Sequence, residues 1–276
     1  MSMKINTNVA SLHGQNAVRR SSEEVGESQS KLASGQRIMK AADDAAGLAI
    51  SEKMKSVIRS SKQANRNAND GISLVQTAEG GLNETSTLLT RMKELAMQAS
   101  TDTLSDSNRQ IVDNEYQAMR MELDRISAST EFGGRKLLNG EGSRLEFQVG
   151  LGGQAMNRVA YEPGSISSGS SALGVGSTSV RTKEGAQSIL GKIDGALDKI
   201  SGHRAMLGSI QNRLQTSSNN LDVYTENMSA SNSRIRDVDF AMETSNMAKN
   251  QIITEAGTAV LSQANMDPKA ALKLLS

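Results

Sequence analysis

Residues 189–263 read ILGKIDGALDKISGHRAMLGSIQNRLQTSSNNLDVYTENMSASNSRIRDVDFAMETSNMAKNQIITEAGTAVLSQ. One seam of mostly apolar positions, alternately four and three residues apart, runs through this stretch: Ile189, Ile193, Ala196, Ile200, His203, Leu207, Ile210, Leu214, Ser217, Leu221, Tyr224, Met228, Ser231, Ile235, Val238, Met242, Ser245, Lys249, Ile252, Ala256, Ala259 and Gln263. Such spacing keeps one helix face toward a partner, which predicts a coiled coil or a long bundle. A helix of this length would reach roughly 110 Å, which no single compact domain encloses.

A second seam of the same kind occupies residues 50–99. It passes through Asp70-Gly71 without a change of phase, so one helix is predicted there in place of a hairpin turn. An aspartate within residues 41–47 is expected to cap this helix. After a loop at residues 100–106, the pair Ser107 and Gln110 predicts a capping box that opens a third helix.

The N-terminal arm, residues 4–40, is a weaker helix. After Ile5, Val9 and Leu12 it offers about one strong apolar residue per heptad, at Val18, Val25, Leu32 and Met39. One apolar residue per heptad cannot hold an isolated helix, which needs a packed face. The arm is therefore expected to need a partner. We expect both terminal arms to be disordered in the monomer and to fold only in an assembly.

Between the two helical limbs, residues 144–149 and 157–161 read as short strands separated by glycine-rich turns. Residues 163–179 are rich in glycine and serine and are expected to form an exposed, mobile connector. The predicted fold is mainly α: a long-helix coiled-coil bundle formed by N- and C-terminal limbs, with a small β-hairpin region at the apex and both termini at one end.

The composition excludes several classes of protein. With 31 basic and 30 acidic residues and no basic block, the chain lacks the clustered positive face that nucleic acid requires. It has no cysteine, so a disulfide framework is excluded. The first thirty residues lack the apolar core of a cleavable signal peptide, and no apolar run is long enough for membrane insertion.

The motifs for enzyme chemistry fail on their context. Gly150 to Ala155 satisfies the dinucleotide pattern G-x-G-x-x-A, but no βαβ unit surrounds it. The glycines of residues 185–191 are spaced wrongly for a phosphate loop. The only histidines, His13 and His203, lie on different limbs and form no metal set. We therefore predict no catalytic, cofactor-binding or metal site, and no enzyme activity.

Several segments, in the same order along the chain, resemble bacterial flagellin, the subunit of the flagellar filament. They are residues 5–12 (INTNVASL), 32–38 (LASGQRI), 41–51 (AADDAAGLAIS), 68–74 (ANDGISL), 94–96 (ELA), 233–241 (SRIRDVDFA) and 257–265 (GTAVLSQAN). His13-Gly14 departs from the small apolar residues usual at that place in the family.

The resemblance implies that residues 1–44 and 234–276 form an inner domain at the filament core. Residues 45–233 would form an outer helical bundle, with the β-hairpin region and connector at about 130–180 and no variable outer domain or metalloprotease insert. It implies these filament-core packing residues: Ile5, Val9, Leu12, Val18, Val25, Leu32, Ile235, Val238, Phe240, Met242, Ile252, Val260 and Leu261.

The same resemblance implies a helical homopolymer outside the cell, exported by the flagellar type III apparatus. Its partners would be an export chaperone, a cap protein and hook-junction proteins. In relatives that stimulate an innate-immune Toll-like receptor, the contact positions match Arg91, Leu95 and Glu115. These three are expected either to form one exposed polar patch with an apolar centre or to be ordinary solvated helix residues, with Leu95 partly in the core. The alternatives are a hook-filament junction protein and a non-polymerising secreted coiled-coil adaptor.

Overall fold

The computed structural model describes residues 7–275, and side-chain positions up to residue 266. Residue contacts divide the chain into two units. The terminal unit comprises the described residues up to Ser56 and from Asn227 onward, and the bundle unit is Val57–Glu226. The predicted class, mainly helical with a small antiparallel β region, is confirmed.

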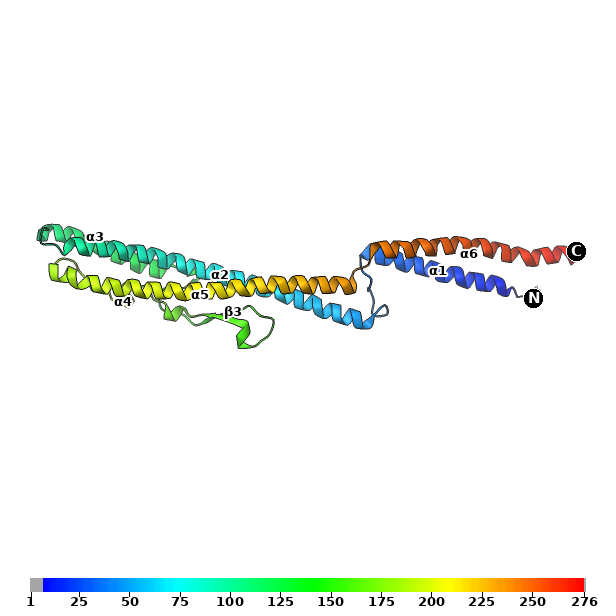
Figure 1. Cartoon of the computed structure of the whole chain (residues 1–276), viewed down its shortest axis with the longest axis horizontal. Coiled ribbons are helices and arrows are strands. Elements are labelled where there is room, and N and C mark those ends of the chain that lie inside the picture. Colours follow the sequence, from blue (N-terminus) through cyan, green and yellow to red (C-terminus); the bar gives the residue numbers. More distant parts are fainter. Residues whose placement is uncertain (1–6, 276) are drawn as a thin grey trace. The chain divides into compact units, whose positions relative to one another are not determined.

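The order of elements follows the chain (Figure 1). The α-helices are α1 (Val9–Ser34), α2 (Ala45–Ala99), α3 (Asp106–Ser129), α4 (Ser170–Leu173), α5 (Lys183–Arg236) and α6 (Phe240–Leu275), and the strands are β1 (Glu131–Phe132), β2 (Arg135–Lys136), β3 (Leu145–Gln148) and β4 (Arg158–Tyr161). Two antiparallel pairs, β1 with β2 and β3 with β4, are the only sheets in the described range. In the second pair Leu145 lies opposite Tyr161, close to the expected strand bounds.

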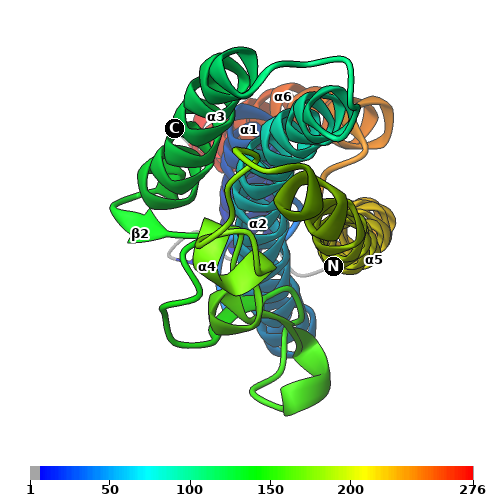
Figure 2. The same ribbon diagram turned by 90° about the vertical axis from the view of Figure 1, so that its left-hand side faces the viewer.

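The bundle unit is built on α2, α3 and α5, which Figure 2 shows side by side. Their facing side chains form one apolar core, with Leu89, Leu123 and Leu207 completely buried. The seams predicted for residues 50–99 and for the first half of 189–263 supply nearly half of the buried residues of this core. Gly71 lies within α2, close to the Leu214 side chain of α5. A Cβ at this position would lie only 3.1 Å from Leu214 Cδ1, so the glycine makes room for a close neighbour without ending the helix.

The two helix starts compare differently with the prediction. Asp44 caps α2, because its Oδ1 accepts a hydrogen bond from the Gly47 amide at 2.8 Å. The cap predicted at Ser107 is wrong, since α3 begins two residues earlier with Ser105 as its N-cap. The Ser105 side chain accepts from the Asn108 amide, two residues ahead of the predicted box.

The connector at residues 163–179 is not the exposed, mobile segment that its composition predicts. It folds back along α3 and buries Ile166, Leu173 and Val175. Asp124 and Asp113 of α3 hold its middle and its C-terminal end: Ser170 N donates to Asp124 at 2.8 Å, and Val180 N, directly after the connector, donates to Asp113 at 2.8 Å. Sparse apolar residues and two carboxylates thus give order to a stretch whose glycine and serine content suggests none.

The seam of residues 189–263 is also interrupted, which corrects the prediction of one continuous face. Helix α5 ends at Arg236, and α6 starts at Phe240 with Asp239 accepting from the Ala241 amide at 3.0 Å. The segment between them pairs with the chain after α1: Val238 N donates to the Gly35 carbonyl at 3.1 Å. Helices α1 and α6 then run side by side in opposite directions (Figure 1).

Candidate functional site

The terminal hairpin, α1 with α6, has an inner seam of mostly small or polar residues. The shielded positions alternate three and four residues apart: Ser11, Gly14, Val18, Ser21, Val25, Ser28 and Leu32 on α1, and Glu243, Met247, Asn250, Thr254, Gly257, Leu261 and Ala264 on α6. Small side chains let two helices approach. The Cα atoms of α1 and α6 repeatedly come within 8 Å, which no other pair of long helices in the described range does.

Hydrogen bonds cross this seam along its length. Asn8 Nδ2 donates to the Ala264 carbonyl at 2.8 Å, and Ser11 Oγ donates to Asn265 Oδ1 at 2.8 Å. Further along, Ser21 Oγ donates to the Asn250 carbonyl at 3.5 Å. The inner face therefore satisfies polar groups and buries little apolar surface.

Most of the large apolar side chains of the hairpin are exposed. Leu12 is 51% exposed and Met242 is 67% exposed, and Val9, Phe240, Ile252 and Val260 fall between them. Among the described side chains of the terminal unit, Ile38 is the only large apolar one that is buried. Many exposed large apolar side chains on one pair of helices are typical of a surface that other helices cover.

Charge is scarce on the exposed face of α6. Between residues 240 and 266 the only charged residues are Glu243, Lys249 and Glu255, and Glu243 belongs to the inner seam. Helix α1 carries six charged residues between Val9 and Ser34, all of them arginine, glutamate or lysine. The outer face of α6 is thus the larger uncharged surface, suited to cover by other helices.

The residues predicted for a packed core fall into three places. Val9, Leu12, Phe240, Met242, Ile252 and Val260 lie on the outer face, and Val18, Val25, Leu32 and Leu261 line the inner seam. Ile235 and Val238 lie at the junction of α5 and α6. Ile5 lies outside the described residues. The sequence reasoning missed Gly14 and Gly257, which the inner seam contains, because it counted only apolar positions.

An arginine pair holds the junction between α1 and α2 to that between α5 and α6. Arg37 Nη2 donates to the Ile235 carbonyl at 2.7 Å. Arg236 forms an ion pair with Glu52, and its Nε donates to Gln36 Oε1 at 3.1 Å. The hydrogen bond from Arg236 lowers the pKa of the Glu52 carboxyl, with a second from Lys55. These interactions hold Gln36 and Arg37, which follow α1, and Glu52 of α2 to the C-terminal end of α5.

The patch expected from Arg91, Leu95 and Glu115 is only partly present. Arg91 Nη2 and Glu115 Oε1 are 2.8 Å apart across α2 and α3, and both side chains are exposed. Leu95 is 1% exposed, because its position belongs to the bundle core. An exposed apolar centre at Leu95 is therefore wrong, and the surface feature is an ion pair.

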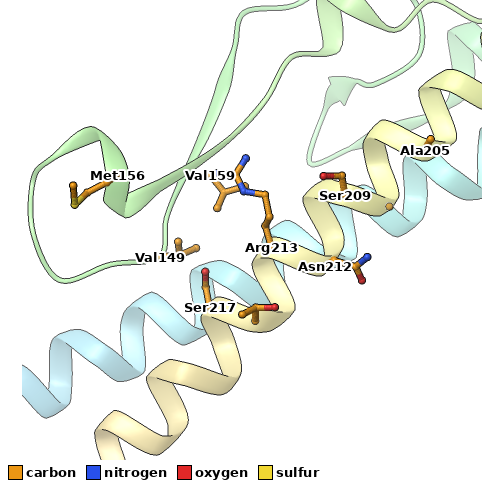
Figure 3. A pocket seen from close by; sticks show the side chains of 10 residues that line it. Val149, Met156, Val159, Ala205, Ser209, Asn212, Arg213 and Ser217 are labelled. Atoms are coloured by element: carbon orange, nitrogen blue, oxygen red, sulfur yellow. The ribbon is translucent and has the colours of Figure 1, made fainter.

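A groove of about 760 Å³ lies in the bundle unit between the β3–β4 hairpin and α5 (Figure 3). Val149, Met156 and Val159 line it from the hairpin side, and Asn212, Arg213 and Ser217 line it from α5 (Figure 3). The lining holds no paired carboxylates and no nucleophile with a base, so we assign it no chemistry.

The remaining chemical groups stand apart. No group of three histidine, aspartate or glutamate residues within the described range could hold a metal ion. His203 is half-buried on the seam of α5, where desolvation, with Lys199 nearby, lowers its pKa. None of the helices that the structure describes has the length and apolar content to cross a membrane.

Comparison with known proteins adds to this geometry. Residues 5–143 match the bacterial flagellin N-terminal helical region, and residues 190–275 match the C-terminal helical region. A flagellin of Halalkalibacterium halodurans is 42% identical over 89% of each chain. The flagellin of Bacillus subtilis is 39% identical over 99% of this chain and 100% of its own. A crystal structure of Bacillus cereus flagellin, 30% identical, superposes with a TM-score of 0.51 over 56% of this chain and 88% of that chain.

Proposed function

Since this chain belongs to the bacterial flagellin family, we propose that its terminal hairpin is the part through which copies join. Flagellins are structural proteins, and this chain is a subunit that polymerises into the flagellar filament used in motility. The proposal concerns which of its surfaces perform the assembly.

One observation carries the proposal: most of the large apolar side chains of the hairpin are exposed, while its inner seam is mostly small or polar. In the bundle unit the same heptad spacing directs leucine, isoleucine and methionine inward. In the hairpin, Met242, Ile252 and Val260 point to solvent. Such a face is stabilised only when other helices cover it, and neighbouring copies supply those helices in a homopolymer.

The energetics support coupled folding and assembly. Fixing one residue costs about 1–2 kcal/mol of backbone entropy, whereas burying a large apolar side chain returns about 1.5–3 kcal/mol. The inner seam of the hairpin holds few large apolar residues. Among the described side chains of the terminal unit, Ile38 is the only large apolar one that is fully shielded. The arms are therefore proposed to be disordered in the monomer and to fold in the polymer.

Limited proteolysis of the full-length monomer, followed by seeded assembly, tests this. We expect cleavage in both arms, a resistant helical fragment of about residues 45–235, and no filaments from that fragment. The intact chain under the same seeding is the control and should form filaments. Resistant termini in a verified monomer, or filaments from the trimmed fragment, would contradict the proposal.

The two parts of the chain would then have different places in the filament. Residues 1–44 and 234–276 are assigned to the filament core, and residues 45–233 to an outer layer. We infer no catalytic activity, cofactor or tightly bound metal, because the described residues offer no catalytic constellation. Stoichiometric zinc or nucleotide in the purified protein, measured by metal analysis and nucleotide extraction, would overturn that inference.

The remaining partners rest on the family. Export through the type III apparatus to the cell exterior, a chaperone on the C-terminal arm, a cap protein and hook-junction proteins are proposed on that ground. For the Toll-like receptor, the exposed Arg91–Glu115 pair is the proposed contact, with Leu95 supporting it from the core. A receptor reporter assay comparing wild type with Arg91→Ala tests this, and equal responses would remove the pair from consideration.

A further inference from the structure

We propose that Asn139 is a self-modification site: its side chain is arranged to deamidate by attack from the Gly140 amide, and the docked connector holds this reaction back. Asn139-Gly140 is the only Asn-Gly pair in the chain. A glycine has no Cβ to shield its amide nitrogen from the preceding side chain. The proposal concerns the bundle unit alone and does not rest on the role proposed for the terminal hairpin.

The side chain of Asn139 is already folded toward the amide that would attack it. Its Oδ1 accepts a hydrogen bond from the Glu141 backbone amide at 3.0 Å, and its Nδ2 donates to Glu141 Oε2 at 3.1 Å. The first of these bonds closes an Asx turn, in which an asparagine side chain bonds to the backbone two residues on. Such a turn brings the carboxamide carbon back over the intervening residue, which here is Gly140.

Each group in this turn has a part in the reaction. Gly140 N loses its proton to water and bonds to Asn139 Cγ, so negative charge develops on Oδ1, where the Glu141 amide donates. The bond between Cγ and Nδ2 then breaks. Nδ2 leaves as ammonia after taking up a proton, which Glu141 Oε2 is placed to relay from water. Water opens the resulting succinimide at either carbonyl, which gives aspartate or isoaspartate. The reaction occurs once in each copy, so it is a self-modification and not an enzyme activity.

The connector blocks the attacking nitrogen. Gly140 N donates to the Ile166 carbonyl at 3.1 Å, and Ser168 N donates to the Leu138 carbonyl at 2.9 Å. The connector is thus paired with this segment as in an antiparallel ladder. The amide proton that must leave is held by a carbonyl oxygen, which cannot take it up. Attack on the asparagine side chain therefore requires local opening of the connector.

The product prevents the connector from returning to the same place. Aspartate at position 139 adds a negative charge next to Glu141, and the two like charges repel. Isoaspartate also lengthens the main chain by a methylene group, directly at the position that pairs with Ser167. Deamidation is therefore a permanent mark of copies whose connector has opened.

The deamidation rate of the full-chain monomer at mildly alkaline pH tests the proposal. Mass spectrometry of the peptide that contains Asn139 measures the mass gain and the isoaspartyl product. Asp124→Ala removes the two hydrogen bonds that this carboxylate accepts from Ser170, from N at 2.8 Å and from Oγ at 2.9 Å. We expect the rate to rise about tenfold, because the loss of these bonds increases the population with an open connector. Circular dichroism checks that the bundle remains helical.

Two further variants separate the connector from general damage to α3. Glu122→Ala is the matched control, since this exposed carboxylate pairs with Arg125 of the same helix, and it should leave the rate at the wild-type value. Lys199→Ala removes the hydrogen bond from Lys199 Nζ to the Ala172 carbonyl at 3.0 Å, a second hold on the connector. It should raise the rate by a smaller factor, and it supplies the test if Asp124→Ala does not fold.

The part of Glu141 is tested with the connector loosened. Adding Glu141→Ala to Asp124→Ala, or to Lys199→Ala, keeps the backbone amide and removes Oε2, so the rate should fall several-fold. An unchanged rate would overturn the part assigned to this carboxylate.

Equal rates in the wild type and in the folded connector variants would overturn the blocking by the connector, as would an equal rise in Glu122→Ala. Absence of deamidation at Asn139 in all of these chains would overturn the site itself. The measurement is made on the monomer, so neither result bears on filament assembly, and the proposed function stands or fails separately.

Discussion

The bundle unit and the terminal hairpin follow the same heptad spacing and fill it with opposite residues. In the bundle, Leu89, Leu123 and Leu207 belong to one apolar core and are fully buried. In the hairpin, small and polar residues occupy most of the facing positions, and residues such as Ile252 are exposed. Heptad periodicity therefore shows which face of a helix packs against another helix. The size of the residues on that face decides whether the chain buries its own large apolar side chains or leaves them for other copies to cover.

The largest effect that distinguishes the two units is expected from a charge on the outer face of the hairpin. Ile252→Asp should abolish filament formation, because burial of an unpaired carboxylate between copies is strongly unfavourable. Thermal unfolding of the bundle unit should stay at the wild-type temperature. Sedimentation and electron microscopy after seeding measure assembly, and Ile252→Leu is the control. Filaments of normal yield from Ile252→Asp would place the interface elsewhere.

A core truncation in the bundle unit should do the reverse. Leu89→Ala removes a completely buried side chain and should lower the free energy of unfolding by about 2–5 kcal/mol. Chemical denaturation followed by circular dichroism measures this loss. The exposed Val223 offers the matched truncation, Val223→Ala, for which a change below about 0.5 kcal/mol is expected. An equal loss of unfolding free energy in Leu89→Ala and Val223→Ala would contradict the assignment of Leu89 to the core.

Alkaline pH is expected to weaken the bundle unit through its buried tyrosines. Burial raises the pKa of Tyr161 to about 12, and its hydroxyl donates to the Leu137 carbonyl at 2.9 Å. The stability from this raised pKa is present below the unfolded value near 10 and is lost as pH rises toward 12, by at most about 2–3 kcal/mol. Tyr161→Phe should reduce the slope of stability against pH in that range. An unchanged slope would assign the alkaline loss to other groups, such as Tyr116, whose pKa burial also raises.

The smallest effect is expected inside the hairpin seam. Ser21→Ala removes only the long hydrogen bond from Ser21 Oγ to the Asn250 carbonyl. That carbonyl still accepts a hydrogen bond from the Thr254 hydroxyl. The change in critical concentration for assembly should correspond to less than about 1 kcal/mol. Sedimentation of filaments at graded protein concentrations measures it. A loss as large as that from Ile252→Asp would show that the inner seam, and not the outer face, dominates assembly.

The sequence predicted the parts of the fold that depend on apolar spacing. The single helix through Asp70-Gly71 and the seam of α5 were predicted because apolar residues dominate their positions, with alanine the commonest in the first and leucine and isoleucine in the second. The break at residues 237–239 was missed because the apolar spacing continues across it, while backbone hydrogen bonds to the chain after α1 decide it. Composition likewise misled for the connector, where three apolar residues and two aspartates outweigh many glycines and serines.

Only part of the candidate site could be predicted from the sequence. Met242, Ile252 and Val260 were predicted to pack at the filament core, but the side of α6 on which they lie requires the position of α1. For Leu95 the sequence left open an exposed patch centre and a partly buried position, and only the contacts of the bundle core decide for burial. The glycines of the inner seam give no hydropathy signal, so sequence reasoning based on apolar spacing cannot find them.

The outward apolar face of the hairpin also has a thermal consequence. Covering Met242, Ile252 and Val260 removes nonpolar surface from water when a copy is added, and ordering of the arms removes more. Such burial carries a large negative heat-capacity change, so the enthalpy of elongation must vary steeply with temperature. The critical concentration should therefore follow a curved van't Hoff plot, with filaments losing subunits on strong cooling as well as on heating.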